Sequence, residues 1–320
     1  MGYEIVQRPL TCARRLACSI AGISLICVQS PAVAQVKETD DLRPAAGVEI
    51  WASTDADETN IFKLLARGLW KFERRDKYQG LAVERVRFSF KSQDSRTDDR
   101  IYLDAADNID RKWLWQARIG RDGGTILGSV SLRTADWKQS YFIERDIVET
   151  PRGVNEGIYY TFLGASYDLP IDDRNILTTM VGLQKFSGEN ERLHARANFI
   201  HVLKPDWGLS AQVRSRYYHS TTPGEFDYYS PKDFLQVVPV LQLRRFSRSG
   251  WMYELRGGYG AQYATGGSWH DARLAELRVE SPASSSDLQA FIEFHYSNNS
   301  VLGGPNYDYV MGRLGITLKP

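Results

Sequence analysis

Hydrophobic and polar residues alternate along most of this chain. In residues 192–199 (RLHARANF) every second residue is apolar, and residues 207–218 repeat the pattern after the turn Lys204-Pro205-Asp206. Successive side chains of a β-strand point to opposite faces, whereas a helix would scatter these apolar residues around its circumference. The pattern predicts two neighbouring strands that share one apolar face and one hydrogen-bonding face.

The same alternation recurs over the whole chain and predicts sixteen strands. They are placed at residues 47–54, 60–72, 80–92, 99–105, 112–121, 124–133, 137–148, 156–169, 174–187, 191–203, 207–219, 233–246, 250–263, 270–281, 286–297 and 306–318. An even number of strands, each about ten residues long, is typical of a bacterial outer-membrane barrel with both ends in the periplasm. With that orientation the long connections, at residues 93–98, 149–155, 220–232, 264–269 and 298–305, all lie outside the cell. The predicted fold is all-β, a 16-stranded antiparallel transmembrane β-barrel of the outer membrane.

Two soluble folds also alternate, the β-sandwich and the β-propeller. Many of the predicted strands exceed the five or six residues usual in soluble sheets, which favours the barrel. Three details depart from a regular pattern. Arg145 shares its parity with Tyr141 and Ile143, which indicates a bulge or a strand end, and residues 257–260 (GGYG) indicate a tight bend within a strand. The last predicted strand ends in Leu318-Lys319-Pro320, without the terminal aromatic residue frequent in such barrels.

Composition agrees with this interpretation. The chain of 320 residues is 42% hydrophobic and 25% charged, with a mean hydropathy of −0.39 and a net charge of +1. These values exclude a polytopic helical membrane protein, which needs apolar runs of about 20 residues. An aromatic content of 12% argues against a disordered chain, and the near-zero charge gives no reason to expect a nucleic-acid partner. A barrel remains compatible because alternation averages to a soluble-looking mean.

The N-terminus has the features of a secretory signal peptide. Arg8, Arg14 and Arg15 precede an uncharged apolar run at residues 16–28, and residues 32–34 (AVA) form a small-x-small cleavage site. The run of 13 residues is too short for a transmembrane anchor. We expect Sec-type export with cleavage before Gln35, a signal peptide at residues 1–34, a flexible periplasmic leader at 35–46 and the barrel at 47–320. All three cysteines, Cys12, Cys18 and Cys27, leave with the signal.

Catalytic and metal-binding patterns are weak. The five histidines form no H-E-x-x-H motif, and the acidic turn at residues 55–58 (DADE) lacks the spaced ligands of an EF-hand. His219 and Ser220 are adjacent, but neighbouring strand residues point to opposite faces, which argues against a hydrolase. The sequence predicts no enzyme, no catalytic residue, no metal and no cofactor.

The polar face of the strands is expected to line the lumen. It would contain Lys63, Arg67, Arg85, Arg87, Gln116, Arg118, Arg192, His194, Arg196, Gln212, Arg214, Arg216, Arg256 and Arg278, with Glu254, Glu276 and Glu293 among them. One interpretation is a structural charge ladder that stabilises a hydrated interior. The other is a conduit whose arginines bind anionic or hydroxyl-rich solutes through their planar multidonor groups, and the two are compatible.

Two sets of residues are the candidates for contact with a solute. The expected lumen contacts are Arg192, Arg196, Arg214, Arg216, Gln212, Arg118, Arg256 and Glu254. The connection at residues 220–232 is expected outside the barrel or folded into its mouth as a gate, with Glu225, Phe226, Asp227, Tyr228 and Tyr229 as the gate residues.

Residues 227–234 (DYYSPKDF) resemble a stretch in the barrel domains of exopolysaccharide exporters, the cellulose synthase outer-membrane subunit and the poly-N-acetylglucosamine exporter. There a similar run enters a strand that carries a proline, which Pro239 would match. Residues 53–57 (STDAD), 144–150 (ERDIVET) and 186–190 (FSGEN) are also similar to such chains. The resemblance implies a sixteen-stranded barrel that forms the outer-membrane exit for a secreted polysaccharide. The family's tetratricopeptide-repeat region is not found in this sequence, so a separate periplasmic scaffold protein would connect the barrel to a synthase complex.

The expected function is a passive conduit for an exopolysaccharide, with outer-membrane lipid and the polysaccharide chain as partners. Two alternatives remain open: a general diffusion porin or small-solute channel, and a plugged barrel that acts as a surface scaffold or adhesin. Conductance distinguishes the porin from a closed or gated pore.

Overall fold

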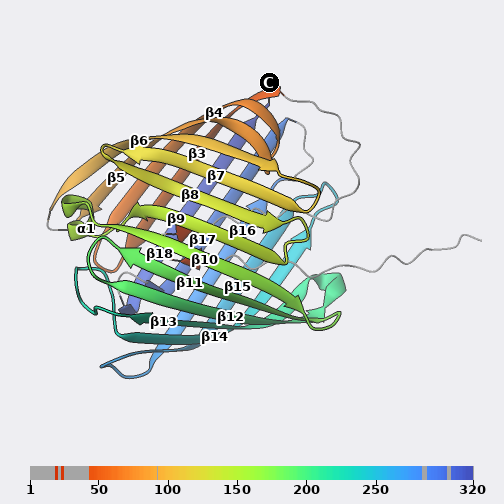
Figure 1. The fold of residues 1–320 in the computed structure, drawn as a ribbon. Coiled ribbons are helices and arrows are strands. Elements are labelled where there is room, and N and C mark those ends of the chain that lie inside the picture. The colour runs from red at the N-terminus through yellow and green to blue at the C-terminus, as the bar shows by residue number, and fades with distance from the viewer. Residues whose placement is uncertain are drawn as a thin grey trace, which may run out of the picture.

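The computed structural model describes residues 19–20, 23–24, 43–91, 93–282, 287–300 and 304–319, and most of them form one closed barrel (Figure 1). Its strands are β3 (Arg43–Asp55), β4 (Asn60–Arg74), β5 (Lys77–Phe90), β6 (Gln93–Asn108), β7 (Trp113–Asp122), β8 (Thr125–Thr134), β9 (Gln139–Ile147), β10 (Tyr159–Pro170), β11 (Asn175–Phe186), β12 (Glu191–Lys204), β13 (Leu209–Ser220), β14 (Asp233–Phe246), β15 (Met252–Ala264), β16 (His270–Glu280), β17 (Leu288–Ser300) and β18 (Gly304–Leu318). A separate pair, β1 (Ser19–Ile20) and β2 (Ile23–Ser24), precedes them.

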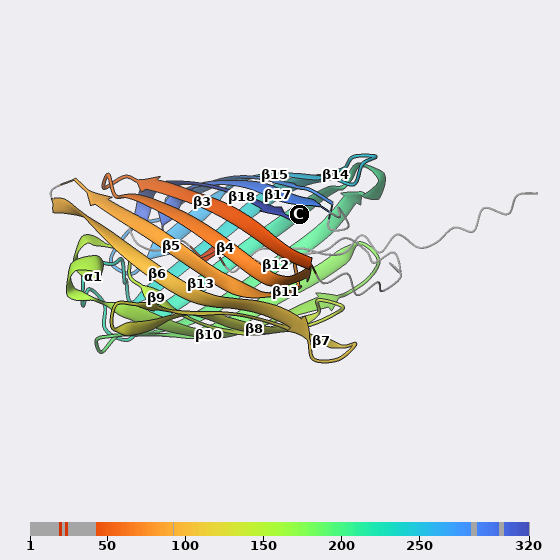
Figure 2. The same cartoon turned by 90° about the horizontal axis from the view of Figure 1, so that it is seen from above.

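Each barrel strand pairs antiparallel with the next, and the last strand closes on the first. The β18–β3 register runs from Leu318 opposite Ala46 to Tyr309 opposite Asp55. The strands run obliquely around the barrel in both views (Figures 1 and 2), as the closure of a sheet requires. The predicted 16-stranded antiparallel barrel is therefore confirmed, and the sandwich and the propeller are excluded.

The predicted signal peptide, its cleavage site before Gln35 and the leader up to residue 42 lie outside the described residues, apart from the short pair β1–β2. Residues 43–46 were expected in the leader but belong to β3, because the strand begins at Arg43. Among the described residues, neither helix is long and apolar enough to cross a membrane.

Exposure alternates along the strands and shows which face points outward. On β12, Leu193 and Phe199 are 54% and 40% exposed, whereas Arg192 and His194 are each 1% exposed. Large exposed apolar side chains recur in this way around the whole barrel, which is the outward band expected of a barrel surrounded by lipid. The predicted polar inner face is correct for β12 and β13.

On β5 the predicted orientation is wrong. Arg85 and Arg87 were expected in the lumen but face outward, since Val86, Phe88 and Phe90 occupy the inner positions and are buried. Apolar and polar residues still alternate along β5, but near Phe90 the apolar residues face the lumen and the polar residues face outward. The physical reason is the segment described below, which folds into the lumen and packs against these side chains.

Two further predictions need correction. A β-bulge between Leu69 and Lys71 reverses the parity of β4, so Phe72 is buried inside instead of lying outside with Trp70. Residues 93–98, expected to be a connection, form the first part of β6. The outer face of β5 and β6 is polar at this end.

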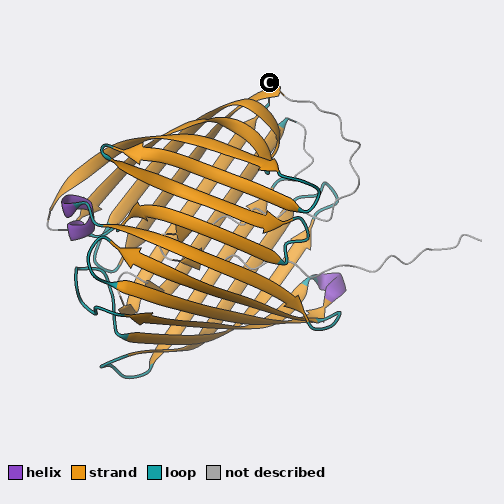
Figure 3. Ribbon diagram, viewed as in Figure 1, coloured by secondary structure: helices purple, strands orange, loops and turns teal. Residues whose placement is uncertain are grey.

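The two ends of the barrel differ (Figure 3). One end carries the chain termini of the barrel and short turns such as η1 (Pro205–Trp207). At the end of η1, Gly208 has φ 65°, and a Cβ there would overlap the carbonyl oxygen of Arg244. The other end, called the mouth below, carries the helix α1 (Pro151–Glu156) and the connection at residues 221–232.

Candidate channel mouth and lumen

The connection between β9 and β10, residues 148–158, folds back into the barrel; we call it the α1 loop. Val154 is fully buried in a cluster with Trp51, Ile61, Val86, Phe88, Phe90, Ile147, Tyr309 and Met311. These side chains come from the inner faces of β3, β4, β5 and β18 and from β9. The loop therefore fills the lumen beside the β3–β5 wall at the mouth.

Polar contacts fix the α1 loop against the same wall. Lys63 Nζ lies 2.6 Å from Glu149 Oε1, and Asn155 Nδ2 donates to Gln93 Oε1 at 2.6 Å. Arg96 donates to the carbonyl oxygen of Val154. Burial raises the pKa of the Glu149 carboxyl above its ordinary value, although the ammonium of Lys63 opposes the shift.

Local sequence explains the short helix in this loop. Thr150 has an extended backbone and its side chain accepts a hydrogen bond from Gly153 N, Pro151 occupies the first turn, and Gly157 ends the helix at φ 71°. The sequence interpretation treated residues 149–155 only as a connection and missed α1. The Thr-Pro start and the glycine stop were the available signal.

The connection at residues 221–232, called the gate loop below, packs onto the α1 loop and the β11 end. The ring of Tyr228 stacks on Phe186 with centroids 4.2 Å apart, and the side chain is 3% exposed. Asn190 Nδ2 donates to the Tyr228 hydroxyl at 2.9 Å, and burial raises the pKa of Tyr228 to about 12. Phe226 packs beside Tyr228. The predicted gate loop is thus folded inward over its neighbours.

Two carboxylates of the gate loop bind neighbouring connections. Asp227 accepts hydrogen bonds from Thr150 Oγ1 at 2.6 Å and from Arg152 N at 2.7 Å, at the start of α1. Glu225 accepts from Asn190 N at 3.1 Å and also from Glu189 N, in the β11–β12 connection. The gate loop and the α1 loop are therefore joined directly across the mouth.

Arg192 supports the gate loop from below. Its Nη2 donates to the carbonyl oxygen of Tyr229 at 2.7 Å and its Nε donates to Ser220 Oγ at 3.2 Å. The guanidinium lies 4.5 Å from the centroid of the Tyr218 ring. Arg192 faces inward as predicted, but at 1% exposure it is covered by the gate loop in this conformation.

The other expected lumen contacts fall into two groups. Arg118, Arg214, Arg256 and Glu254 belong to ion-pair networks, with Arg118 Nη2 2.7 Å from Asp104 and Arg256 Nη1 2.7 Å from Glu276. Gln212 hydrogen-bonds to Gln242 in the same region. This group fits the charge-ladder interpretation. Asp104, which is fully buried beneath Arg118, was not among the expected lumen residues.

Arg196 and Arg216 form the second group. They are direct register partners on β12 and β13, and both belong to the inward parity. The Arg216 guanidinium lies 4.9 Å from the centroid of the Phe234 ring. Both arginines therefore face the inner wall, as the sequence predicted, and remain candidates for contact with a solute.

A row of rings crosses the inner wall at the level of these arginines. Centroid distances are 5.4 Å for Phe142–Phe162, 5.1 Å for Phe162–His194, 5.6 Å for His194–Tyr218 and 4.9 Å for Tyr218–Phe234. The row spans β9, β10, β12, β13 and β14. Sequence reasoning placed His194 in the lumen but did not recognise that rings from several strands form a row with it.

The pair His219 and Ser220 does not form a nucleophile–base site. His219 is half-exposed on the outer parity, with its Nδ1 2.8 Å from Asp233 Oδ1. Ser220 is buried and its hydroxyl accepts from Arg192. Adjacent strand residues thus point to opposite faces, as the sequence argument required.

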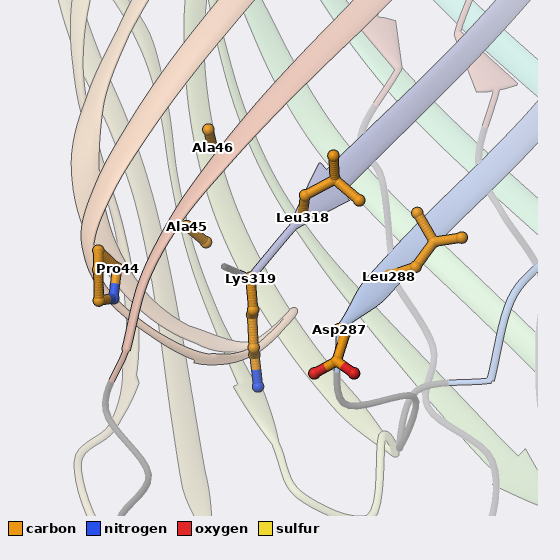
Figure 4. Close-up of a pocket in the computed structure, with 7 residues that line it drawn as sticks. All are labelled: Pro44, Ala45, Ala46, Asp287, Leu288, Leu318 and Lys319. Atoms are coloured by element: carbon orange, nitrogen blue, oxygen red, sulfur yellow. The ribbon is translucent and has the colours of Figure 1, made fainter.

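A hollow of about 540 Å³ lies at the opposite end of the barrel, between the starts of β3 and β17 and the end of β18 (Figure 4). It is lined by Pro44, Ala45, Ala46, Asp287, Leu288, Leu318 and Lys319. This hollow lies far from the mouth. Its lining is mainly apolar and contains neither Arg196 nor Arg216.

No family model and no curated protein sequence matches the chain. Among solved structures, a "Bacterial polysaccharide outer membrane secretin" aligns at 12% identity with a TM-score of 0.62, covering 88% of this chain and 100% of that one. Acinetobacter baumannii OccAB3 (8% identity, TM-score 0.44, 88% and 100% covered) and the KdgM porin in complex with disordered oligogalacturonate (8%, 0.37, 86% and 99%) are more distant. The first likeness shows that this chain shares the barrel fold of that structure, as predicted; the TM-scores of the other two are too low to support a comparison of folds.

Proposed function

We propose that this protein is an outer-membrane channel through which a polysaccharide leaves the cell, and that the described conformation is its closed state. The observation that carries the proposal is the mouth itself. The gate loop and the α1 loop meet there through Asp227 and Thr150, above an inner wall of arginines and aromatic rings.

The chemistry of the inner wall favours a polysaccharide that carries anionic or densely hydroxylated sugars. Arginine presents several donors in a rigid plane, which suits carboxylate, phosphate or vicinal hydroxyl groups. The ring row from Phe142 to Phe234 offers flat apolar surfaces beside these donors, as sites for small sugars commonly do. The likeness to a polysaccharide secretin barrel supports the same class of cargo.

In this proposal no residue performs catalysis and no cofactor takes part. The barrel is exported with cleavage before Gln35, and a separate periplasmic scaffold protein hands the chain over from a synthase complex. N-terminal sequencing of the mature protein tests the cleavage site. Crosslinking at the end of the barrel that carries the termini tests the periplasmic partner.

The decisive experiment is genetic. Deleting the gene should abolish surface polysaccharide while its synthesis inside the cell continues, and the wild-type gene should restore export. The double variant Arg196→Gln/Arg216→Gln should restore it poorly, whereas Lys185→Gln, which removes an outward-facing ion pair with Glu191, should restore it fully. Unchanged surface polysaccharide in the deletion strain would refute the proposal.

The closed mouth also favours a second candidate, a permanently plugged barrel that acts as a surface scaffold or adhesin. Planar-bilayer recording separates the candidates. A channel with a displaceable gate should show rare openings that become frequent when the gate loop is weakened. A scaffold should remain silent in every variant, and a diffusion porin should conduct steadily without any change.

A further inference from the structure

Four arginines face outward near the mouth, on alternate strands of one half of the barrel. They are Arg85 and Arg87 on β5, Arg121 on β7 and Arg145 on β9. Each lies a few residues before its strand ends at the mouth, since these strands end at Phe90, Asp122 and Ile147. Arg85, Arg87 and Arg121 are exposed, and Arg145 is partly covered by the ring of Tyr159.

Strand register places the four side chains on one stretch of the outer wall. Ile101 on β6 pairs with Arg121, and its second neighbour Asp99 pairs with Arg85. Gly128 on β8 pairs with Arg145 and Ile119, whereas Ile126 pairs with Arg121, so the outward side chains of Ile101 and Ile126 flank Arg121. Alternate strands are about 10 Å apart, a distance that two long arginine side chains can span. We call these four residues the arginine patch.

The patch marks the boundary of the apolar band. The next outward residues on the same strands, in the direction away from the mouth, are Val83, Ile119 and Ile143, which are 53%, 47% and 44% exposed. Apolar outward side chains belong to the hydrocarbon region, so the patch lies at the level of the lipid headgroups. Asp99 pairs with Arg85 at 2.7 Å, which leaves a clear positive excess in the patch.

The other half of the mouth rim has the opposite character. Its outward carboxylates are Asp233 on β14, Asp271 on β16 and Asp308 on β18. Tyrosine hydroxyls donate to two of them, Tyr217 to Asp233 at 2.7 Å and Tyr296 to Asp308 at 2.8 Å. Arg273 is also outward on this side and pairs with Asp271, so this part of the rim lacks the positive excess of the arginine patch.

We propose that the arginine patch binds phosphate groups of glycolipid headgroups in the outer leaflet of the membrane. Guanidinium forks donate two parallel hydrogen bonds to a phosphate, and their attraction is strong where lipid reduces screening by water. The ligand is a membrane component and not the exported polymer. The inference is therefore independent of the proposed export function.

The test uses the full protein purified in neutral detergent and titrated with lipopolysaccharide, with binding measured by native mass spectrometry. Each basic residue near an anionic surface is worth about fivefold in binding, so Arg87→Gln/Arg121→Gln should weaken binding about 25-fold at low salt. Arg273→Gln is the matched control, because Arg273 is an exposed outward arginine on the carboxylate side, paired with Asp271. We expect the control to bind within twofold of the wild type.

Three further measurements define the outcome. Lipopolysaccharide with its phosphates removed should bind the wild type as weakly as the double variant does. Millimolar inorganic phosphate should not displace the intact lipid. Heat-dependent migration in gels should show that each variant forms a barrel. The proposal would be overturned if the double variant and the control lost lipopolysaccharide binding equally, or if neither lost it. Displacement of the lipid by inorganic phosphate would also overturn it.

Discussion

Removing the ring of Tyr228 should open the mouth. This ring is 3% exposed, stacks on Phe186 at 4.2 Å and accepts a hydrogen bond from Asn190. A buried aromatic side chain covers roughly 150–250 Å², which corresponds to about 4–6 kcal/mol at 25 cal/mol per Å². Because a released gate loop keeps part of this contact, Tyr228→Ala should favour release by about 3 kcal/mol.

Each 1.4 kcal/mol changes an equilibrium tenfold, so Tyr228→Ala should raise the open fraction by roughly 100-fold. Tyr228→Phe keeps the ring and loses the hydroxyl that accepts from Asn190 and donates to Glu225, which costs about 1 kcal/mol and predicts a rise of roughly fivefold. Single-channel recording in planar bilayers measures the open fraction directly. Tyr217→Ala is the control, since Tyr217 lies on the outer face of the neighbouring strand and is 38% exposed.

The order of the variants is the critical result. If Tyr228→Phe opened the channel as much as Tyr228→Ala, the stacking argument would be wrong. If Tyr228→Ala and Tyr217→Ala behaved like the wild type, the gate loop would not control conduction. An open fraction that rose equally in both would indicate a general loosening of the barrel.

Three other perturbations test the remaining features. Val154→Asp places a charge in the fully buried contact of the α1 loop, so the loop should leave the lumen, and limited proteolysis should cut within residues 148–158 faster than in the wild type. Burial raises the pKa of Glu149, so the docked α1 loop binds a proton more tightly than the released loop does. Docking is therefore strongest at a pH below 4.5, the ordinary pKa of this carboxyl. It weakens as the pH rises through the higher pKa of the docked loop. Channel openings should therefore increase with pH over that window, and Glu149→Gln should abolish the increase. Gly208→Ala combines a φ of 65° with an overlap at the carbonyl oxygen of Arg244. Thermal unfolding followed by gel migration should therefore show a lower midpoint for this variant. Gly224→Ala should lower the midpoint less, because Gly224 is exposed and has open space around it.

The strands were the most predictable part of this molecule. Residues 191–203 and 207–219 were predicted as neighbours, and the structure places β12 at Glu191–Lys204 and β13 at Leu209–Ser220. A period of two, interrupted by a turn such as Lys204-Pro205-Asp206, is a local signal that survives folding. Fold class and strand order follow from it directly.

The orientation of some strands was less predictable, because alternation defines two faces without saying which is inside. On β5 the apolar face turns inward to meet Val154, a partner that only the folded α1 loop supplies. The bulge that redirects Phe72 also leaves no clear mark in the sequence. Both errors arose because apolar strand residues were expected to face outward, whereas contacts with residues distant in the sequence hold these side chains inside.

The candidate gate residues were named from the sequence, but the residues that they contact were not. Thr150 and Asp227 are 77 positions apart, and nothing in either segment indicates the other. Similarly, the inward arginines were expected, yet the covering of Arg192 depends on how the gate loop folds. Contacts between connections are set by the barrel that positions them, so they become visible only in three dimensions.

The seam between β3 and β18 has a consequence for how the protein is made. Glu49 and Arg313 meet there although they are 264 positions apart in the sequence. Until the 15 residues of β18 arrive, the chain is a ribbon with two unpaired edges, and each edge is a template for pairing with another chain. The edge of β3 is therefore open to pairing with another chain until β18 closes the seam.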